Sequence, residues 1–307
     1  MNGHWQKLGL LYRFPGEGLH PKLLTHVANP LPLHIDGDVY RIFFCSRDGE
    51  NRSSIGGVDI NILTHEVVKQ YEQPFFEFGP SGSFYADGVS IGNCYTVDGI
   101  RYLFFMGWQS PKDSHFRGDI GRIVIKPDLS LALDHTWPVM GTDSTDPISL
   151  SYPWVVGDSE RGFDMWYGST AAWDAGNGEM LHVLHHASSD DGHEWRRNGQ
   201  VVPHQLDVAQ AFSRPTIARS SSGQWQMWFS YRGGLGTKYR IGYAESMDKH
   251  VWHLALNDAG IDVSPTGWDS EMIEYPFVFD HKDQRYMLYN GNNYGKSGFG
   301  LAIFSHD

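Results

Sequence analysis

The chain has 307 residues, with 24 Lys and Arg against 36 Asp and Glu, so its formal net charge is −12. This acidic balance disfavours nucleic acid or an anionic membrane as the main partner. The N-terminal residues show no basic region followed by an apolar run, and no apolar segment approaches the ~20 residues that span a bilayer. We therefore expect a cytoplasmic protein that acts without nucleic-acid or membrane partners.

In chain order, the sequence repeats one strand-rich unit. Each copy opens with a short apolar strand that begins with a polar or aromatic residue followed by Pro or Gly. The openings are Asn29-Pro30-Leu31, Asp87-Gly88-Val89, Tyr152-Pro153-Trp154, Arg214-Pro215-Thr216 and Tyr275-Pro276-Phe277. Successive openings lie 58, 65, 62 and 61 residues apart, so five units account for nearly the whole chain.

Two further strands follow in each copy. A polar turn leads to an aromatic second strand, at residues 39–45, 101–106, 163–167, 224–230 and 285–289. A longer loop leads to a third strand, at residues 55–60, 120–125, 181–187, 239–244 and 298–304. Residues 187–195 and 244–252 share Ala, Ser, Asp, His and Trp at a constant offset of 57, which favours a fourth, outer strand in each unit.

Strand-rich units of this length, without a long amphipathic helix, are typical of β-propeller blades. Because one blade cannot bury both faces of its sheet, blades stack in a ring. We predict an all-β protein, a five-bladed β-propeller, in which residues 1–307 form a single domain with blades that start near 29, 87, 152, 214 and 275. Residues 9–14 would supply the missing outer strand of the last blade. A β-sandwich or two β domains are the alternative.

Five units with turns of the type Ser-x-Asp-Gly-x-x-Trp, and with a polar residue opening each inner strand, resemble the five-bladed propeller glycosidases. These are the arabinanases, β-xylosidases and invertases, with the related mannoside phosphorylases. The resemblance covers almost the whole chain. It implies a carbohydrate substrate and an active site in a funnel at one end of the ring axis. The innermost strands begin in this funnel, and the loops between second and third strands form its rim.

The resemblance also implies a set of catalytic positions. In that superfamily an Asp of the first blade acts as base or nucleophile, and a Glu of the third blade is the acid. An Asp of the second blade acts as an orienting residue and pKa modulator. Only the second position matches here, as Asp87. Asn29 stands at the first position and Ser151-Tyr152 at the third, so the chain departs from the usual triad.

Glycosidic cleavage needs two carboxyl groups, one to protonate the leaving oxygen and one to attack or to activate water. The main candidates are Asp87, at the mouth of its strand, and Glu274, whose aromatic and apolar neighbours would raise its pKa. Glu271 is an alternative three residues earlier, and Asp48 lies in a charged loop that would rim the funnel. Each candidate also has a structural alternative. Asp87 would be a turn Asp bound to its own backbone, Glu274 would form a salt bridge to an arginine of the ring, and Asp48 would lie in a solvated hairpin loop.

Arginines and aromatic residues would hold the substrate. Arg47, Arg52, Arg214 and Arg232 would bring guanidinium groups to one cavity, and guanidinium forks bind carboxylate or phosphate. We therefore expect a carbohydrate ligand, with a uronic acid, a sialic-acid-like sugar or a sugar phosphate as options, unless these arginines pair with the carboxylates. The other predicted substrate-binding residues are Asn29, Trp108, Tyr152, Trp173 and Tyr275.

No metal or nucleotide motif is present. The sequence lacks a His-Glu-x-x-His motif, a tight Cys/His cluster and a Gly-rich phosphate loop before a helix. We expect no cofactor, while the sequence decides neither for nor against a calcium ion in the channel, and it does not indicate an oligomeric state. The first hypothesis is a glycoside hydrolase-like enzyme. A non-catalytic module for glycans or sugar phosphates is the second, and a protein-interaction scaffold, which a charged axial mouth argues against, is the third.

Overall fold

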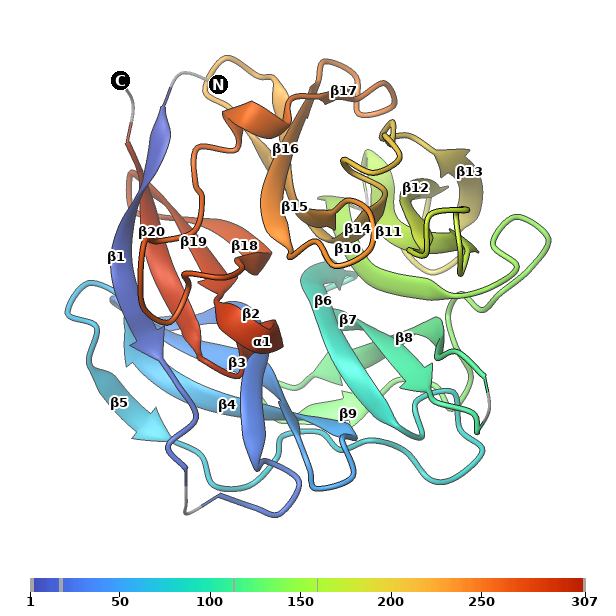
Figure 1. The fold of residues 1–307 in the computed structure, drawn as a ribbon. Coiled ribbons are helices and arrows are strands. Elements are labelled where there is room, and N and C mark those ends of the chain that lie inside the picture. The colour runs from blue at the N-terminus through green and yellow to red at the C-terminus, as the bar shows by residue number, and fades with distance from the viewer. Residues whose placement is uncertain (1–2, 17–18, 113, 159, 306–307) are drawn as a thin grey trace.

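The structure is a computed structural model that describes residues 3–16, 19–112, 114–158 and 160–305. Nearly all of its regular structure is β (Figure 1). The strands pair in antiparallel groups of four, each named here from its first strand outwards. These are β2 (Thr25–Asp36), β3 (Val39–Arg47), β4 (Ser53–Asn61) and β5 (Val67–Gln70); β6 (Gly88–Val97), β7 (Ile100–Gln109), β8 (Arg117–Ile125) and β9 (Leu131–Leu133); β10 (Leu150–Asp158), β11 (Gly162–Ala172), β12 (Leu181–Ser189) and β13 (Arg196–Gln200); β14 (Ala211–Arg219), β15 (Trp225–Arg232), β16 (Arg240–Ser246) and β17 (His253–Leu254); and β18 (Glu274–His281), β19 (Gln284–Asn290), β20 (Phe299–Ser305) and β1 (His4–Tyr12).

These groups match the units expected from the sequence, including the predicted second and third strands. The N-terminal strand pairs with β20, from His4 opposite Ser305 to Tyr12 opposite Phe299. The N-terminal strand thus pairs at the edge of the last group, over residues 4–12 where the sequence suggested 9–14. The remaining regular elements are a short 3-10 helix, η1 (Leu256–Asp258), and one helical turn, α1 (Asn292–Gly295). Within the described part of the chain, no helix is long and apolar enough to cross a membrane.

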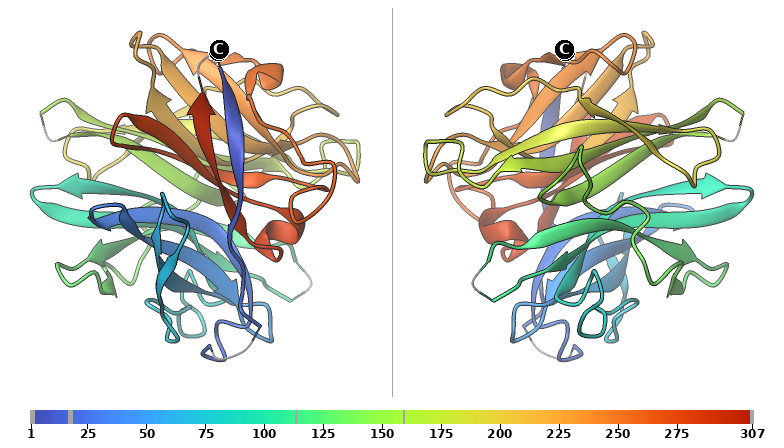
Figure 2. Two further views of the ribbon diagram at one scale, coloured as in Figure 1. Left: turned by 90° about the vertical axis from the view of Figure 1, so that its left-hand side faces the viewer. Right: turned by 90° about the vertical axis from the view of Figure 1, so that its right-hand side faces the viewer.

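The groups are arranged about a common centre (Figures 1 and 2). Their first strands contact one another in the order β2, β6, β10, β14 and β18, and β18 contacts β2 in turn. A parallel bridge from Ser53 to Gly88 joins the first two groups, and one from His182 to Ala211 joins the third and fourth. At the other junctions the described strands do not pair and side chains pack instead, as Trp228 of β15 does against Trp5 of β1 with ring centroids 5.5 Å apart.

The paired turns predicted from the internal match have one geometry. Asp191 and Asp248 each accept two backbone N–H bonds, from residues two and three positions later in the chain. Ser189 and Ser246 donate to these carboxylates and accept a backbone N–H from the same turn. Short polar side chains that bind their own backbone fix such turns locally, which is why the sequence repeats them.

Each first strand contains a bulge near the centre of the molecule. The pairing with the second strand skips two residues there, and these are Asn29-Pro30, Gly92-Asn93, Tyr152-Pro153, Arg214-Pro215 and Tyr275-Pro276. The first residue has a φ of 54°, 36°, 45° and 54° at Asn29, Tyr152, Arg214 and Tyr275. A left-handed non-Gly residue costs about 1 kcal/mol or more and persists only where its surroundings impose it.

This register corrects the prediction for the second unit. The sequence alignment places Asp87-Gly88 at the strand opening, whereas the structure places Gly92-Asn93 there. Asp87 instead precedes β6, and its backbone pairs with Trp108 and Ser53. The sequence alignment misplaced this opening because Asn93 follows Gly92, whereas a proline follows the first residue of each of the other four bulges.

Arg214 joins three of the first strands at the centre. Its side chain is buried, with 1% of the residue exposed. Nη1 donates to the carbonyl of Tyr275 at 2.7 Å, Nη2 to that of Pro30 at 2.8 Å, and Nε to that of Ile91 at 3.3 Å. A buried guanidinium loses its hydration, so these carbonyls are the groups that satisfy its donors.

We expect Arg214→Met to destabilise the protein by about 3 kcal/mol, because it leaves three buried carbonyls without donors. Urea unfolding followed by circular dichroism measures this loss. Arg219→Met, at the exposed end of the same strand, is the matched control and should change stability by less than about 0.5 kcal/mol. Equal effects of the two substitutions would contradict the assigned role of Arg214.

Candidate functional site

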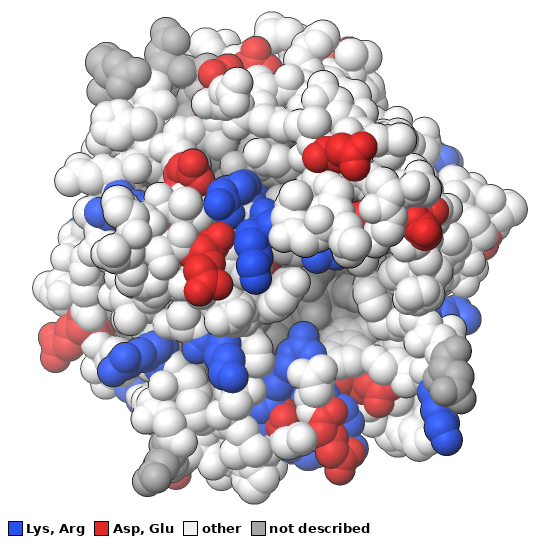
Figure 3. All heavy atoms as spheres, in the orientation of Figure 1, with Lys and Arg blue, Asp and Glu red and all other residues white. Residues whose placement is uncertain are grey.

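The candidate site lies at the end of the molecule that carries the loops between second and third strands. The turn α1 and the loop before β16 are both at this end. Figure 3 shows that Lys and Arg side chains gather there around a central hollow, with Asp and Glu beside them. This is the face on which the resemblance places an active site.

Glu274 is the first residue of β18, directly before the bulge at Tyr275. It is 0% exposed, and neither carboxyl oxygen makes a hydrogen bond of ordinary geometry. Burial raises the pKa of Glu274 well above its ordinary value, and only Arg232 and the backbone of Tyr294 oppose this shift. Burial therefore favours the neutral, protonated form of this carboxyl group.

Arg232, at the end of β15, connects Glu274 to a second carboxylate. Its Nη2 lies 2.7 Å from Glu179 Oε1, and its guanidinium lies over the ring of Tyr239 at 5.0 Å from the centroid. Its buried Nε has no hydrogen-bond partner. Arg232 and Glu274 thus both present unsatisfied polar atoms inside one part of the protein. Buried polar groups without partners call for a water or a ligand.

Tyr239, Tyr275 and the backbone of Tyr294 lie beside Glu274, and Tyr152 contacts Tyr275. Tyr152 and Tyr275, from equivalent bulges, place their hydroxyl oxygens 3.4 Å apart. The rings of Tyr239 and Tyr294 lie 6.2 Å apart, and Tyr294 is 42% exposed on α1. Burial raises the pKa of Tyr239 and of Tyr275, with Glu274 among the groups that add to the shift. Tyrosine rings and hydroxyls of this kind suit a sugar, which has both apolar faces and hydroxyl groups.

A protonated carboxylic acid in an apolar setting can donate a proton or a hydrogen bond at neutral pH. The arrangement therefore supplies one carboxyl group whose protonated form burial favours, one carboxylate bound to an arginine, and several tyrosine rings. Perturbed titratable groups of this kind mark functional sites more often than they occur elsewhere.

The other predicted carboxyl groups serve the loops. Asp48 accepts bonds from the backbone of Glu50 and Arg52 and forms an ion pair with the Arg52 guanidinium at 2.9 Å. Asp87 accepts the Ser110 N–H at 2.6 Å. Glu271 is exposed. Within the described residues, no hydrogen bond or ion pair joins Asp87 to Glu274.

Asp87 and Arg52 instead line a separate pocket of about 630 Å³ at the rim of the first two groups. Their carboxylate and guanidinium groups already have the partners given above. The hairpin-loop alternative considered for Asp48 describes its contacts, whereas Asp87 accepts its bond from Ser110 and not from the backbone of its own turn.

The predicted substrate-binding residues lie in different parts of the structure. Arg214 lies in the core, where carbonyls occupy its donors, and not at the mouth. Asn29 is buried against Asn290, whose side-chain oxygen accepts its N–H at 2.9 Å. Trp173 stacks on His115 with ring centroids 4.4 Å apart. Tyr152, Tyr275 and Arg232 lie with Glu274, while Arg47 lies over the ring of Trp108 at 5.4 Å.

Sequence reasoning missed Glu179 and Tyr239. Glu179 lies in the loop between β11 and β12, and Tyr239 directly precedes β16. Their position in loops between second and third strands was the available signal, because these loops were expected to form the rim. Nothing local distinguishes Glu179 from Asp174 in the same loop, since its burial depends on Arg232 of the next group.

The described residues contain no group of three or more His, Cys, Asp and Glu side chains that could hold a metal ion. The buried histidines have other partners. His182 lies between Ser151 Oγ and Thr170 Oγ1, at 2.6 and 2.8 Å, and His186 lies 2.9 Å from Asp164.

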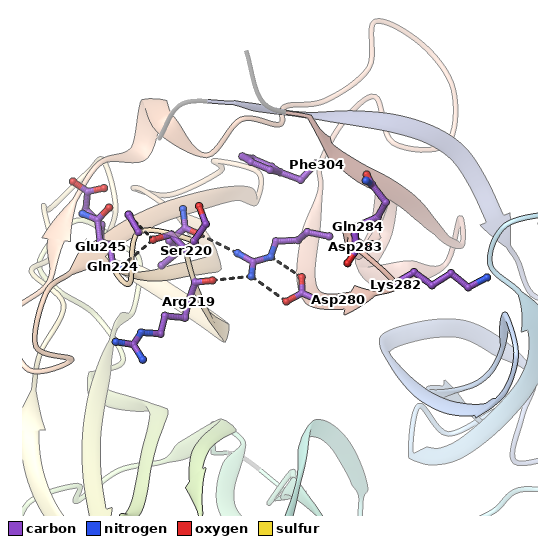
Figure 4. Close-up of a pocket in the computed structure, with 13 residues that line it drawn as sticks. Arg219, Ser220, Gln224, Glu245, Asp280, Lys282, Asp283, Gln284 and Phe304 are labelled. Atoms are coloured by element: carbon purple, nitrogen blue, oxygen red, sulfur yellow. Dashed lines mark hydrogen bonds and ion pairs between the residues drawn. The ribbon is translucent and has the colours of Figure 1, made fainter.

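A further pocket lies at the opposite end, among the turns between first and second strands. It measures about 790 Å³ (Figure 4). Arg285 spans it, donating to Asp280 and to the carbonyl of Arg219. Its buried polar residue, Gln226, already bonds to Tyr243 and Arg285, so we do not assign the site to this pocket.

We expect Glu274→Gln to stabilise the protein at neutral pH. A raised folded pKa means that the native state binds a proton which the unfolded state releases above about pH 4.3, so stability falls by about 1.4 kcal/mol per pH unit until the folded pKa is reached. Glutamine removes this loss. Thermal unfolding at pH 4 and pH 8 should show a gain at pH 8 that disappears near pH 4. A gain that is the same at both pH values would contradict a protonated Glu274.

Comparison with known proteins agrees with this fold. The solved structures that resemble the chain include a glycoside hydrolase (TM-score 0.76, 15% identity, covering 98% of this chain and 91% of that one). A GH130 glycoside hydrolase that targets β-1,2 mannosidic linkages has a TM-score of 0.70 at 11% identity, over 99% and 94% of the two chains. A thermostable family-43 glycoside hydrolase has a TM-score of 0.67 at 15% identity, over 96% and 92%. The chain thus has the fold of the propeller glycosidases, as the sequence resemblance implied.

No protein-family profile matches the chain. Two relatives from Mycobacterium tuberculosis, the uncharacterized proteins Rv1502 (strain ATCC 25618 / H37Rv) and MT1551 (strain CDC 1551 / Oshkosh), are each 40% identical over 307 residues. These alignments cover 98% of this chain and 99% of each relative. The chain therefore belongs to the same protein family as Rv1502 and MT1551.

Proposed function

We propose that the protein is a carbohydrate-active enzyme that cleaves or transfers the glycosidic bond of a small glycoside, with Glu274 as its general acid. The observation that carries this proposal is the fully buried, unpaired carboxyl group of Glu274 beside Arg232, Tyr239 and Tyr275. A general acid must hold its proton at working pH, and desolvation of Glu274 supplies that condition.

The proposal includes the five-bladed arrangement as a single domain. The cyclic contacts among the first strands and the fold of the glycoside hydrolases support it. In such a ring, the bulges of the first strands converge on the axis. Glu274 and Tyr275 of β18 then face Tyr152 of β10, in agreement with the contact between the two tyrosine hydroxyls.

In the proposed reaction, Glu274 donates its proton to the glycosidic oxygen as the bond from that oxygen to the anomeric carbon breaks. Water, phosphate or another sugar forms the new bond to the anomeric carbon. Where water attacks, its proton passes to a base. We assign this role to Glu179, the carboxylate that Arg232 holds. Glu274 regains its proton from solvent before the next cycle.

A non-catalytic module for a glycan or a sugar phosphate is the second candidate. It is favoured by one observation: the carboxylate of Glu179 is bound to Arg232, and Asp48 and Asp87 are bound to their loops. A module of this kind would use Glu274 and the tyrosines as hydrogen-bonding and stacking groups only.

A panel of aryl glycosides, with and without phosphate, separates the two candidates. We expect Glu274→Gln to lower kcat by about 10²- to 10⁴-fold on glycosides with poor leaving groups, which need protonation. The loss should be much smaller with 2,4-dinitrophenolate as leaving group. Glu179→Gln should lower kcat with both kinds of leaving group where water is the acceptor.

Glu271→Gln is the matched control, because Glu271 lies three residues before Glu274 and is exposed. It should retain wild-type turnover. The enzyme proposal fails if glycans bind, no glycoside in the panel is turned over, and Glu274→Gln does not alter binding. That outcome favours the binding module.

A further inference from the structure

We propose that Arg47, Lys296 and His26 form an anion subsite at the mouth of the site, which takes a phosphate or carboxylate carried by the sugar. This inference rests on the proposed function, since it names the class of substrate that the same site accepts. The two anions share the chemistry that recognises them, namely a guanidinium and an ammonium group beside an imidazole.

Arg47 differs from the other arginines predicted at the mouth. Arg52 is paired with Asp48 and Glu50, Arg232 with Glu179, and Arg214 with carbonyls. Arg47 makes no ion pair with the described residues.

The contacts of Arg47 leave it available to a ligand. Nη1 donates to the side-chain and main-chain oxygens of Asn51, at 2.9 and 3.1 Å, and the guanidinium lies over the ring of Trp108. A guanidinium held by neutral groups and an aromatic face keeps its charge and its remaining donors for a ligand.

The backbone brings Lys296 and His26 to the same place. Thr25 of β2 is paired with Arg47 of β3, so His26 directly follows the residue opposite Arg47. The turn α1 packs on β2, since a side chain at Gly295 would come within 3.0 Å of Ala28. Lys296 follows that turn, is exposed, and makes no ion pair within the described residues.

The electrostatics agree with this placement. Burial, and after it the charges of Arg47 and Lys296, lower the pKa of His26 to about 4. Among the described residues no carboxylate opposes this shift. His26 is therefore neutral at pH 7, and the two cations remain as the source of attraction for an anion.

The subsite adjoins the tyrosines beside Glu274. Arg47 is near enough to Tyr152 to favour its ionised form, and the hydroxyl of Tyr152 contacts that of Tyr275. Lys296 is two residues after Tyr294, whose backbone lies beside Glu274. A sugar ring among the tyrosines would thus place a charged substituent over Arg47 and Lys296.

Binding of inorganic phosphate and of acetate tests the subsite without any sugar. Isothermal titration calorimetry at pH 7.5, with ionic strength held constant by NaCl, should show saturable binding of at least one anion to the wild type. Arg47→Gln and Lys296→Gln should each weaken it by about tenfold or more, as loss of a charged hydrogen bond implies. Arg219→Gln and Lys282→Gln, at the opposite end, are the matched controls and should bind like the wild type.

The two anions distinguish the ligands. Preference for phosphate indicates a phosphorylated sugar or free phosphate, and preference for acetate indicates a uronic-acid type of sugar. The inference is overturned if the wild type binds neither anion, or if Arg47→Gln and Lys296→Gln bind both as the wild type does, with unfolding temperatures unchanged. Because no turnover is measured, this result is independent of whether Glu274 acts as an acid.

Discussion

The centre of the molecule depends on one buried guanidinium. Arg214 projects from the bulge of β14 and donates to carbonyls of β18, β2 and β6. Burial lowers the pKa of Arg214 to about 10, so it remains charged at neutral pH. A charge so far from solvent is costly unless its donors are satisfied, and only the carbonyls released by the bulges are available to it. The need to satisfy the donors of Arg214 therefore fixes β2, β6 and β18 relative to β14.

The same bulges build the candidate site. A residue with positive φ followed by proline gives up a ladder hydrogen bond and turns its side chain out of the sheet pattern. At Tyr152 and Tyr275 this brings two hydroxyls together, and Glu274 precedes the second of them. The backbone strain at these positions is maintained by the packing around Arg214, so one interaction supports both the fold and the geometry of the site.

Charge is distributed unevenly across this face. Arg52 and Arg232 are paired with carboxylates, and burial favours the protonated form of Glu274. The surroundings of Glu274 therefore carry little net charge although the protein is strongly acidic. Attraction for an anion is left to Arg47 and Lys296, which lack acidic partners among the described residues. A neutral interior next to a cationic rim would separate two tasks, proton donation to the glycosidic bond and recognition of a substituent.

Much of this could be predicted from the sequence, because repeated turns and alternating strands are set by local chemistry. The repeat, the second and third strands, the completion of the last unit by the N-terminal strand and the burial of Glu274 all followed from neighbouring residues. Tertiary structure alone decided the bulge at Gly92, where no proline marks it. It alone also decided the carbonyl partners of Arg214 and the pairing of Glu179 with Arg232. Each of these depends on groups far apart in the chain, and their burial and unmet hydrogen bonds exist only once the strands are packed.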